Sequence, residues 1–173
     1  MGEQLIYQEK VSSSWITLIL ALIAAVFLVM FVYQVTTGPI GKRPAPNWFL
    51  FVMFVLFVAL TFNFSHINIK ITPEHITVSY GIASRRFRWN DINDCYIDDV
   101  PAISYGGWGI RIAKVRGKLR LVYNTIGGPR VVLSLSKGKI NEFVFSTKNP
   151  DVIISMIKQK ISESKLQGNG KHS

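Results

Sequence analysis

An uncharged apolar run near the N-terminus limits what this chain can fold into. Residues 15–35, WITLILALIAAVFLVMFVYQV, contain no charged side chain. As a helix, this run would extend about 31 Å, enough to cross the hydrocarbon core of a bilayer. A cleaved signal peptide is the competing interpretation, but the run is longer than a signal-peptide core and no small-residue cleavage site follows it. We therefore predict a transmembrane helix over residues 15–35.

A second uncharged run follows a short linker. Residues 48–64, WFLFVMFVLFVALTFNF, would extend about 26 Å as a helix, and we interpret them as a second span. The linker, residues 36–47, is too short for a domain, so the two helices would form a hairpin with both termini on one side. Basic residues beyond the second span favour the cytoplasmic side of the cell membrane. Residues 1–14 are interpreted only as an N-terminal segment.

The two predicted spans lack the groups that transport requires. Neither 15–35 nor 48–64 contains Asp, Glu, Lys, Arg or His. Ion and proton pathways normally place such ionisable side chains within the membrane. The sequence therefore disfavours a transporter or channel that acts alone.

The sequence pattern changes after residue 65. Ile67, Ile69 and Ile71 alternate with polar residues, and further short alternating stretches follow, separated by Gly and Pro turns. We expect seven or eight strands in an antiparallel sandwich or partly open barrel. Asn149-Pro150-Asp151 is typical of a helix start, and the following apolar residues recur at helical spacing. A domain over 65–162 would thus end in one amphipathic helix, followed by a flexible tail, 163–173.

Five stretches of this domain combine turn residues with alternating apolar positions: ITPEHITVSYG, RWNDI, YGGWGIR, VVLSLSKGK and FSTKNPD. In these stretches the chain resembles small prokaryotic membrane proteins with PH-like (bacterial pleckstrin-homology) domains. The resemblance covers about residues 68–161 and implies an α+β, mostly antiparallel β, PH-like barrel capped by a C-terminal helix, after a two-helix transmembrane hairpin. It implies no uniform activity. Eukaryotic lipid-binding PH domains carry basic residues in their first hairpin, whereas this chain has Thr72-Pro73-Glu74, which argues against inositol-lipid recognition of that kind.

The charge of the chain lies mainly in the predicted domain. The formal net charge is +10, and only Lys10, Lys42 and Arg43 among the basic residues precede Lys70. A basic domain tethered to apolar helices suits an anionic lipid surface. If alternate turns of the domain, predicted at residues 84–86 and 116–118, return toward the membrane, four basic residues would contact anionic headgroups: Arg85, Arg86, Arg116 and Lys118.

The stretch Tyr105-Gly106-Gly107-Trp108-Gly109 holds three glycines and a tryptophan. Its backbone N–H groups could bind an anion, but no helix follows to strengthen such a site. We therefore interpret the stretch as a corner in which the glycines take positive φ and Trp108 folds onto the barrel. If it has a function, residues 105–108 would face a cytoplasmic partner.

The sequence contains no recognisable catalytic or metal-binding constellation. The four acids Asp91, Asp94, Asp98 and Asp99 do not match a calcium loop, so we interpret them as solvated turn acids. Cys95, the single cysteine, fits a buried inert thiol. No nucleophile elbow, zincin helix or dinucleotide motif occurs. We therefore predict no catalytic, cofactor-binding or metal-binding residue, and no enzyme activity of the chain alone.

These features together predict a membrane-anchored PH-like interaction module. It would act as a scaffold or subunit of a membrane assembly, with anionic lipids and another membrane or cytoplasmic protein as partners. One alternative is a nucleic-acid-binding membrane protein, which the basic composition suggests but the absence of nucleic-acid-binding motifs opposes. Another is an accessory subunit of a membrane enzyme complex.

Overall fold

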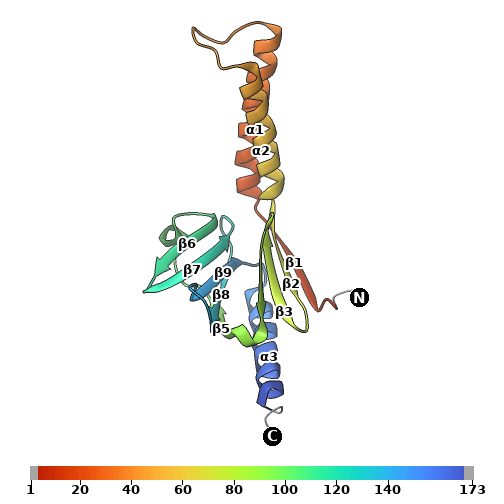
Figure 1. Cartoon of the computed structure of the whole chain (residues 1–173), viewed down its shortest axis with the longest axis vertical. Helices are drawn as coiled ribbons and strands as arrows, with labels where there is room; N and C mark the ends of the chain where they lie inside the picture. The colour runs from red at the N-terminus through yellow and green to blue at the C-terminus, as the bar shows by residue number, and fades with distance from the viewer. Residues whose placement is uncertain (1–3, 170–173) are drawn as a thin grey trace. The chain divides into compact units, whose positions relative to one another are not determined.

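The computed structural model describes residues 4–169 of the chain and the side chains of residues 4–166. It divides into two compact units (Figure 1). One unit, residues 13–65, is a pair of helices and is called the helical hairpin below. The other combines residues 4–12 with residues 66–169 and is called the β-domain. Together they give an α+β chain: a helix pair, two β-sheets and a C-terminal helix.

The helical hairpin consists of α1 (Ser14–Thr36) and α2 (Asn47–Asn63). Aromatic rings pack between the helices, with Phe27 and Phe57 stacked at 5.6 Å between ring centroids. The mean hydropathy of α1 reaches 2.9, so α1 is long and apolar enough to cross a membrane, a criterion that a signal sequence near the N-terminus can also meet. α2, which covers most of the predicted second span, has 17 residues and is shorter than α1, which has 23.

A strand that the sequence did not predict precedes the helical hairpin. β1 (Tyr7–Ser12) pairs antiparallel with β2 (His66–Ile71), from Tyr7 opposite Ile71 to Ser12 opposite His66. The carboxylate of Glu9 is buried and accepts hydrogen bonds from the Thr147 hydroxyl at 2.8 Å and the Lys148 backbone N–H at 2.5 Å. The residues before α1 are therefore part of the β-domain.

The first sheet of the β-domain has the order β1-β2-β3-β4 and is antiparallel throughout. Its remaining strands are β3 (His75–Tyr80) and β4 (Ala83–Arg88). The alternating isoleucines Ile67, Ile69 and Ile71 are fully buried, which confirms the period-two interpretation. The prediction of a turn at residues 84–86 was wrong. The chain turns at residues 81–82, where Gly81 has φ +59°, so Arg85 and Arg86 lie within β4.

The second sheet has the order β5-β8-β9-β7-β6. Its strands are β5 (Ile92–Ile97), β6 (Gly109–Val115), β7 (Lys118–Asn124), β8 (Arg130–Leu135) and β9 (Glu142–Ser146). The short 3-10 helices η1 (Trp89–Asp91) and η2 (Ala102–Tyr105) flank β5. The sheet is mixed because β7 and β9 run parallel. The described residues thus form nine strands in two sheets: β2 to β9 are eight strands within the predicted domain, in agreement with the expected seven or eight, and β1 is additional.

The C-terminal helix, α3 (Pro150–Asn169), packs against β5, η1 and β8. It begins at Pro150 as predicted, and it buries Ile153, Ile157 and Ile161 against the sheet. The predicted end near residue 162 was too early. Glu163 accepts hydrogen bonds from Gln159 and Lys160, and such side-chain pairs stabilise a further helical turn. Residues 170–173 of the predicted tail lie outside the described residues.

The contacts of Glu9 give the first testable prediction. Replacing Glu9 with alanine should lower the free energy of unfolding by about 1–3 kcal/mol, because the buried hydroxyl of Thr147 and the backbone N–H of Lys148 lose their acceptor. Gln8, the exposed neighbour in β1, provides the matched control, and Gln8→Ala should change stability by less than about 0.5 kcal/mol. Thermal and denaturant unfolding of the full chain would measure both. Equal stability of the two variants would contradict a structural role for β1.

Candidate functional site

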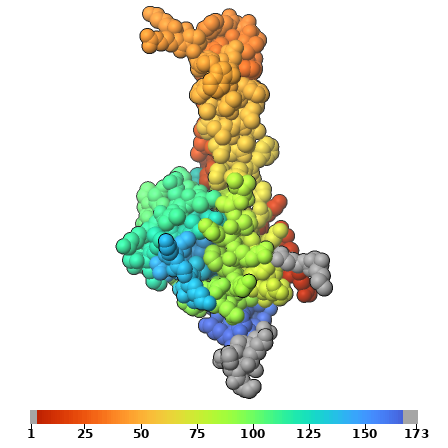
Figure 2. Space-filling model, viewed as in Figure 1, coloured from red at the N-terminus to blue at the C-terminus, as the bar shows by residue number. Residues whose placement is uncertain are grey.

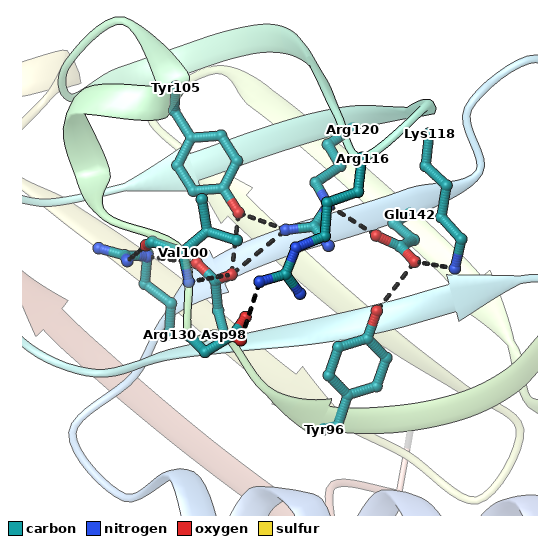
Figure 3. Close-up of polar contacts among 10 residues, drawn as sticks. Tyr96, Asp98, Val100, Tyr105, Arg116, Lys118, Arg120, Arg130 and Glu142 are labelled. Carbon is teal, nitrogen blue, oxygen red and sulfur yellow. Dashed lines mark hydrogen bonds and ion pairs between the residues drawn. The ribbon is translucent and has the colours of Figure 1, made fainter.

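A cluster of charged side chains is buried beneath the loop that joins β5 to β6, residues 98–108 (Figure 3). Arg120 of β7 and Glu142 of β9 lie opposite each other in the parallel strand pair, so their side chains share one face of the sheet. Asp98 enters from the start of the loop. The side chains of Arg120, Asp98 and Glu142 are 4%, 0% and 1% exposed, so the cluster is almost fully shielded from water. We call this group, with Arg130, Tyr105, Tyr96 and Lys118, the charge cluster.

The guanidinium of Arg120 joins the two carboxylates of the charge cluster. Its Nε donates to Glu142 Oε2 at 2.6 Å, and its Nη1 donates to Asp98 Oδ1 at 3.3 Å. Nη1 also donates to the Tyr105 hydroxyl at 2.6 Å. Charged groups that leave water need such partners, because an uncompensated buried charge costs several kcal/mol.

Asp98 fixes the beginning of the loop through further contacts. Its carboxylate accepts hydrogen bonds from the Tyr105 hydroxyl at 2.9 Å, from Arg130 Nε at 2.7 Å and from the Val100 backbone N–H at 3.3 Å. Arg130 also donates to the backbone carbonyl of Val100. The guanidinium carbons of Arg120 and Arg130 lie 6.0 and 5.7 Å from the centroid of the Tyr105 ring. Both arginines thus hold the loop through Asp98 and Tyr105.

Glu142 has partners on both of its oxygens. Besides Arg120, it accepts hydrogen bonds from the Tyr96 hydroxyl at 2.8 Å and from Lys118 Nζ at 2.5 Å (Figure 3). Lys118 is the most exposed of these partners, with its side chain 53% exposed, and Tyr96 is half-buried. The charge cluster is therefore exposed to water at Lys118 and shielded from water around Arg120 and Asp98.

The charge cluster changes the acidity of its members. Burial alone would raise the pKa of Glu142, but the hydrogen bonds from Lys118 and Tyr96 and the charge of Arg120 outweigh it and hold the pKa below its usual value. Burial, with the hydrogen bond and charge of Glu142, raises the pKa of Tyr96 to about 12. Burial, with the hydrogen bond to Asp98, likewise raises the pKa of Tyr105 to about 12. Glu142 is consequently ionised and the tyrosines are neutral around pH 7.

Two predictions for this region were wrong. Asp98 was interpreted as a solvated turn acid, yet it is buried because Arg120 and Arg130 converge on it. Its neighbour Asp99 is exposed and pairs with Arg116 at 3.2 Å. Trp108 was expected to fold onto the barrel, but it is 46% exposed, and Tyr105 fills the buried position instead. Tyrosine fits there because its hydroxyl can both donate to Asp98 and accept from Arg120.

The glycines of the loop adopt the predicted corner. Gly106, Gly107 and Gly109 have φ of +76°, +108° and +97°, values that L side chains rarely adopt. The Asn124 side chain donates to the Gly107 carbonyl at 3.2 Å, and Arg111 Nε donates to the Trp108 carbonyl at 3.2 Å. The corner is therefore held to β6 and β7 as well as to the charge cluster.

The fixed loop exposes apolar side chains next to the edge strand β6. Ile103 is 83% exposed in the loop, and Ile112 is 66% exposed on β6, with Trp108 and Ile110 between them in sequence. Among the described residues, β6 pairs with β7 on one side and has no strand on the other. In the space-filling view, the loop and β6 form part of the outer surface of the β-domain (Figure 2). We call Ile103, Trp108, Ile110 and Ile112 the apolar edge.

The four basic residues predicted to contact lipid do not form one group. Arg116, at the β6–β7 turn, pairs with Asp99, and Lys118 pairs with Glu142. Arg85 and Arg86 project from opposite faces of β4, since they are adjacent in a strand. Contact of these residues with anionic headgroups remains a prediction.

The structure also locates the residues considered for metal binding and nucleophilic chemistry. Among the described residues, no three His, Cys, Asp or Glu side chains are grouped so that they could hold a metal ion. Cys95 is buried as predicted, and burial together with the charge of Asp94 raises the pKa of its thiol to about 12. A thiol with this pKa is not a nucleophile at neutral pH.

Comparison with known proteins identified no relative: no protein-family model, no curated protein and no solved structure matches the chain. The site must therefore be interpreted from its own geometry.

The charge cluster predicts a large difference between two arginines. Arg120→Ala should destabilise the chain by about 3–5 kcal/mol, because Asp98 and Glu142 would remain buried with fewer partners. Arg116→Ala removes the same side-chain type from the exposed pair with Asp99 and should cost less than about 1 kcal/mol. Denaturant unfolding of both variants would test this. A similar loss for both would mean that the charge cluster contributes little to stability.

The pKa shifts predict a pH window for the charge cluster. The pKa of Glu142 is lowered in the folded state, so its contribution is present above about pH 4.5 and is lost as pH falls through the folded pKa. The pKa values of Tyr96 and Tyr105 are raised from 10.0 to about 12, so their contribution is complete below pH 10 and is lost toward pH 12. The stability difference between wild type and Glu142→Gln should therefore shrink below about pH 4.5. A difference that stays constant from pH 7 to pH 3 would contradict this assignment.

Proposed function

We propose that this protein is a membrane-anchored, non-enzymatic interaction module of PH-like type that serves as a scaffold or subunit of a membrane assembly. The helical hairpin would cross the membrane twice, and the β-domain would bind an extended segment of a partner protein at the apolar edge. Basic residues of the β-domain would contact the anionic lipid surface. The observation that carries the proposal is the apolar edge, held in place by the charge cluster.

The pairing of β1 with β2 supports a two-span anchor. These strands flank the helical hairpin in sequence and are neighbours in one sheet, and the Ser13 N–H donates to the Ser65 carbonyl at 2.8 Å. If α1 crosses the membrane, the chain must return, and α2 is the segment available to do so. A helix of about 26 Å can span with slight thinning of the bilayer. Cleavage of α1 as a signal sequence would remove β1 from the sheet, which argues against that interpretation.

The topology also follows from this pairing. Because the residues before α1 and after α2 share a sheet, both termini would lie on the same side of the membrane. Arginines of β4, including Arg85 and Arg86, favour the cytoplasmic side.

The apolar edge supports protein binding. Natural proteins usually protect edge strands with charge or proline, because exposed strand N–H and C=O groups pair readily with other chains. β6 carries Arg111 and Lys114, but it also presents the exposed Ile110 and Ile112, and the loop adds Ile103 and Trp108. An extended partner segment could continue the sheet at β6 and place alternate apolar side chains against these residues. Arg111 and Lys114 on the same strand would favour acidic residues in the partner.

The charge cluster supports a positioning role rather than catalysis. Its carboxylates bind arginine, tyrosine and lysine side chains, and the interior of the cluster is closed to water. A loop fixed before binding loses less conformational freedom when a partner arrives. The same pairing weakens the nucleic-acid alternative, because Arg116, Lys118, Arg120 and Arg130 are already engaged by carboxylates.

Site-specific photo-crosslinking in native membranes tests the proposed interface. A photoreactive amino acid at Ile112 or Trp108 should yield one discrete adduct with a partner protein, and Arg120→Ala should reduce its amount by loosening the loop. Ile82, 94% exposed in the β3–β4 turn, offers a matched exposed apolar control and should yield no such adduct. The same adduct from Ile82, or none from Ile112 and Trp108, would contradict the proposal.

A further inference from the structure

A pocket of about 260 Å³ lies in the β-domain between β4, β7 and the β8–β9 turn. Its floor is apolar: Phe87 and Leu135 are half-buried, and Leu121 and Phe143 are buried. Leu121 and Phe143 are opposite each other in the parallel pair β7–β9, and the Phe87 ring lies 4.9 Å from the Phe143 ring between centroids. This volume is several times the roughly 30 Å³ that a water molecule occupies. An open apolar pocket of this size is a place where a ligand can bury apolar surface.

The rim of the pocket is basic. Arg85 precedes Phe87 by two residues in β4 and so shares its face, and Lys137 and Lys139 stand on either side of Gly138 in the β8–β9 turn. Gly138 has φ +102°, which lets the chain reverse sharply between the two lysines. No acidic residue lines this pocket, and none of the three basic side chains forms an ion pair within the described part of the chain.

The pocket and the charge cluster lie on opposite faces of the same two strands. Arg120 and Glu142 face the charge cluster, whereas the next residues, Leu121 and Phe143, line the pocket. In the charge cluster every arginine has a carboxylate partner. The basic residues at the rim of the pocket have no carboxylate partner among the described residues, so an anionic ligand could pair with them.

From this arrangement we propose that the pocket binds an amphiphilic anion: one phosphate or carboxylate group attached to a short apolar chain or ring. The apolar part would lie on the floor, and the anionic group would contact Arg85, Lys137 and Lys139. The volume is below the 300–1,000 Å³ typical of drug-sized ligands, so the buried part is short. This site is separate from the apolar edge and adds a ligand to the proposed interaction module. The ligand has two possible sources, a membrane lipid or a free organic anion.

Hexyl phosphate is a suitable probe because it combines both features in a short molecule. The full chain, held in nanodiscs of zwitterionic lipid, would be titrated calorimetrically, with empty nanodiscs subtracted. We expect one hexyl phosphate per chain. Inorganic phosphate lacks the apolar part and hexanol lacks the anion, so each should bind at least about tenfold more weakly. Equal binding of hexyl phosphate and inorganic phosphate, or no saturable binding of hexyl phosphate, would overturn the proposal.

Substitutions then locate the bound molecule. The double variant Lys137→Gln/Lys139→Gln should weaken hexyl phosphate binding by about fivefold for each charge removed. The matched control Lys10→Gln/Lys70→Gln removes two exposed charges from β1 and β2 and should leave the affinity unchanged. Ile140, which also lines the pocket, is half-buried, and Ile140→Trp should fill the space and weaken binding. Equal affinities of the two double variants would place the ligand elsewhere and overturn the proposal.

Mass spectrometry of the organic extract from purified protein separates the two sources. A phospholipid retained by the wild type and depleted in Lys137→Gln/Lys139→Gln would identify a membrane lipid as the ligand. A smaller organic phosphate or carboxylate with the same dependence would identify a free anion. Either result supports the pocket, and an extract that is identical for the two proteins would count against it.

Discussion

Arg120 bridges Glu142 and Asp98, and this bridge fixes the β5–β6 loop, which carries the exposed side chains of Ile103 and Trp108. It connects β9, β7 and the β5–β6 loop through contacts of 2.6 and 3.3 Å. Each of these charges would be costly to bury alone, so the three must be buried together. Tyr105 and Arg130 then complete the coordination of Asp98, and the loop has little freedom left. The exposed positions of Ile103 and Trp108 follow from this internal arrangement.

Successive side chains of β7 and β9 point to opposite faces of the sheet, so the same two strands line both the charge cluster and the apolar pocket. One face carries Arg120 and Glu142, and the other carries Leu121 and Phe143. A one-residue slip of β7 against β9 would place charged side chains in the apolar pocket and apolar ones in the charge cluster. One face of these strands needs charged side chains and the other needs apolar ones, so both faces favour the same register of β7 against β9.

Local patterns predicted local structure in this chain and failed where distant segments meet. The alternating isoleucines of β2, the helix start at Pro150, the buried Cys95 and the positive φ of the loop glycines follow from neighbouring residues. The burial of Asp98 depends on Arg120 and Arg130, which are 22 and 32 residues away. Trp108 and Tyr105 could not be distinguished by apolarity. The buried position needs a hydroxyl that donates to Asp98 and accepts from Arg120, and Tyr105 supplies it. The sequence does not show this need, because it arises only when Asp98 and Arg120 come together in the fold.

β1 was missed for a related reason, and it links the folding of the β-domain to the helical hairpin. Glu9 is an inward-facing acid whose partners are the side chain of Thr147 and the backbone of Lys148, 138 and 139 residues along the chain. Joining β1 to β2 closes a loop of roughly 50 residues, and the entropic cost of closure rises with loop length. The packed helices reduce this cost, since they hold Ser13 and Ser65 within hydrogen-bonding distance. If the hairpin inserts into a membrane, insertion would hold the two helices together in the same way and so keep β1 next to its partner strand.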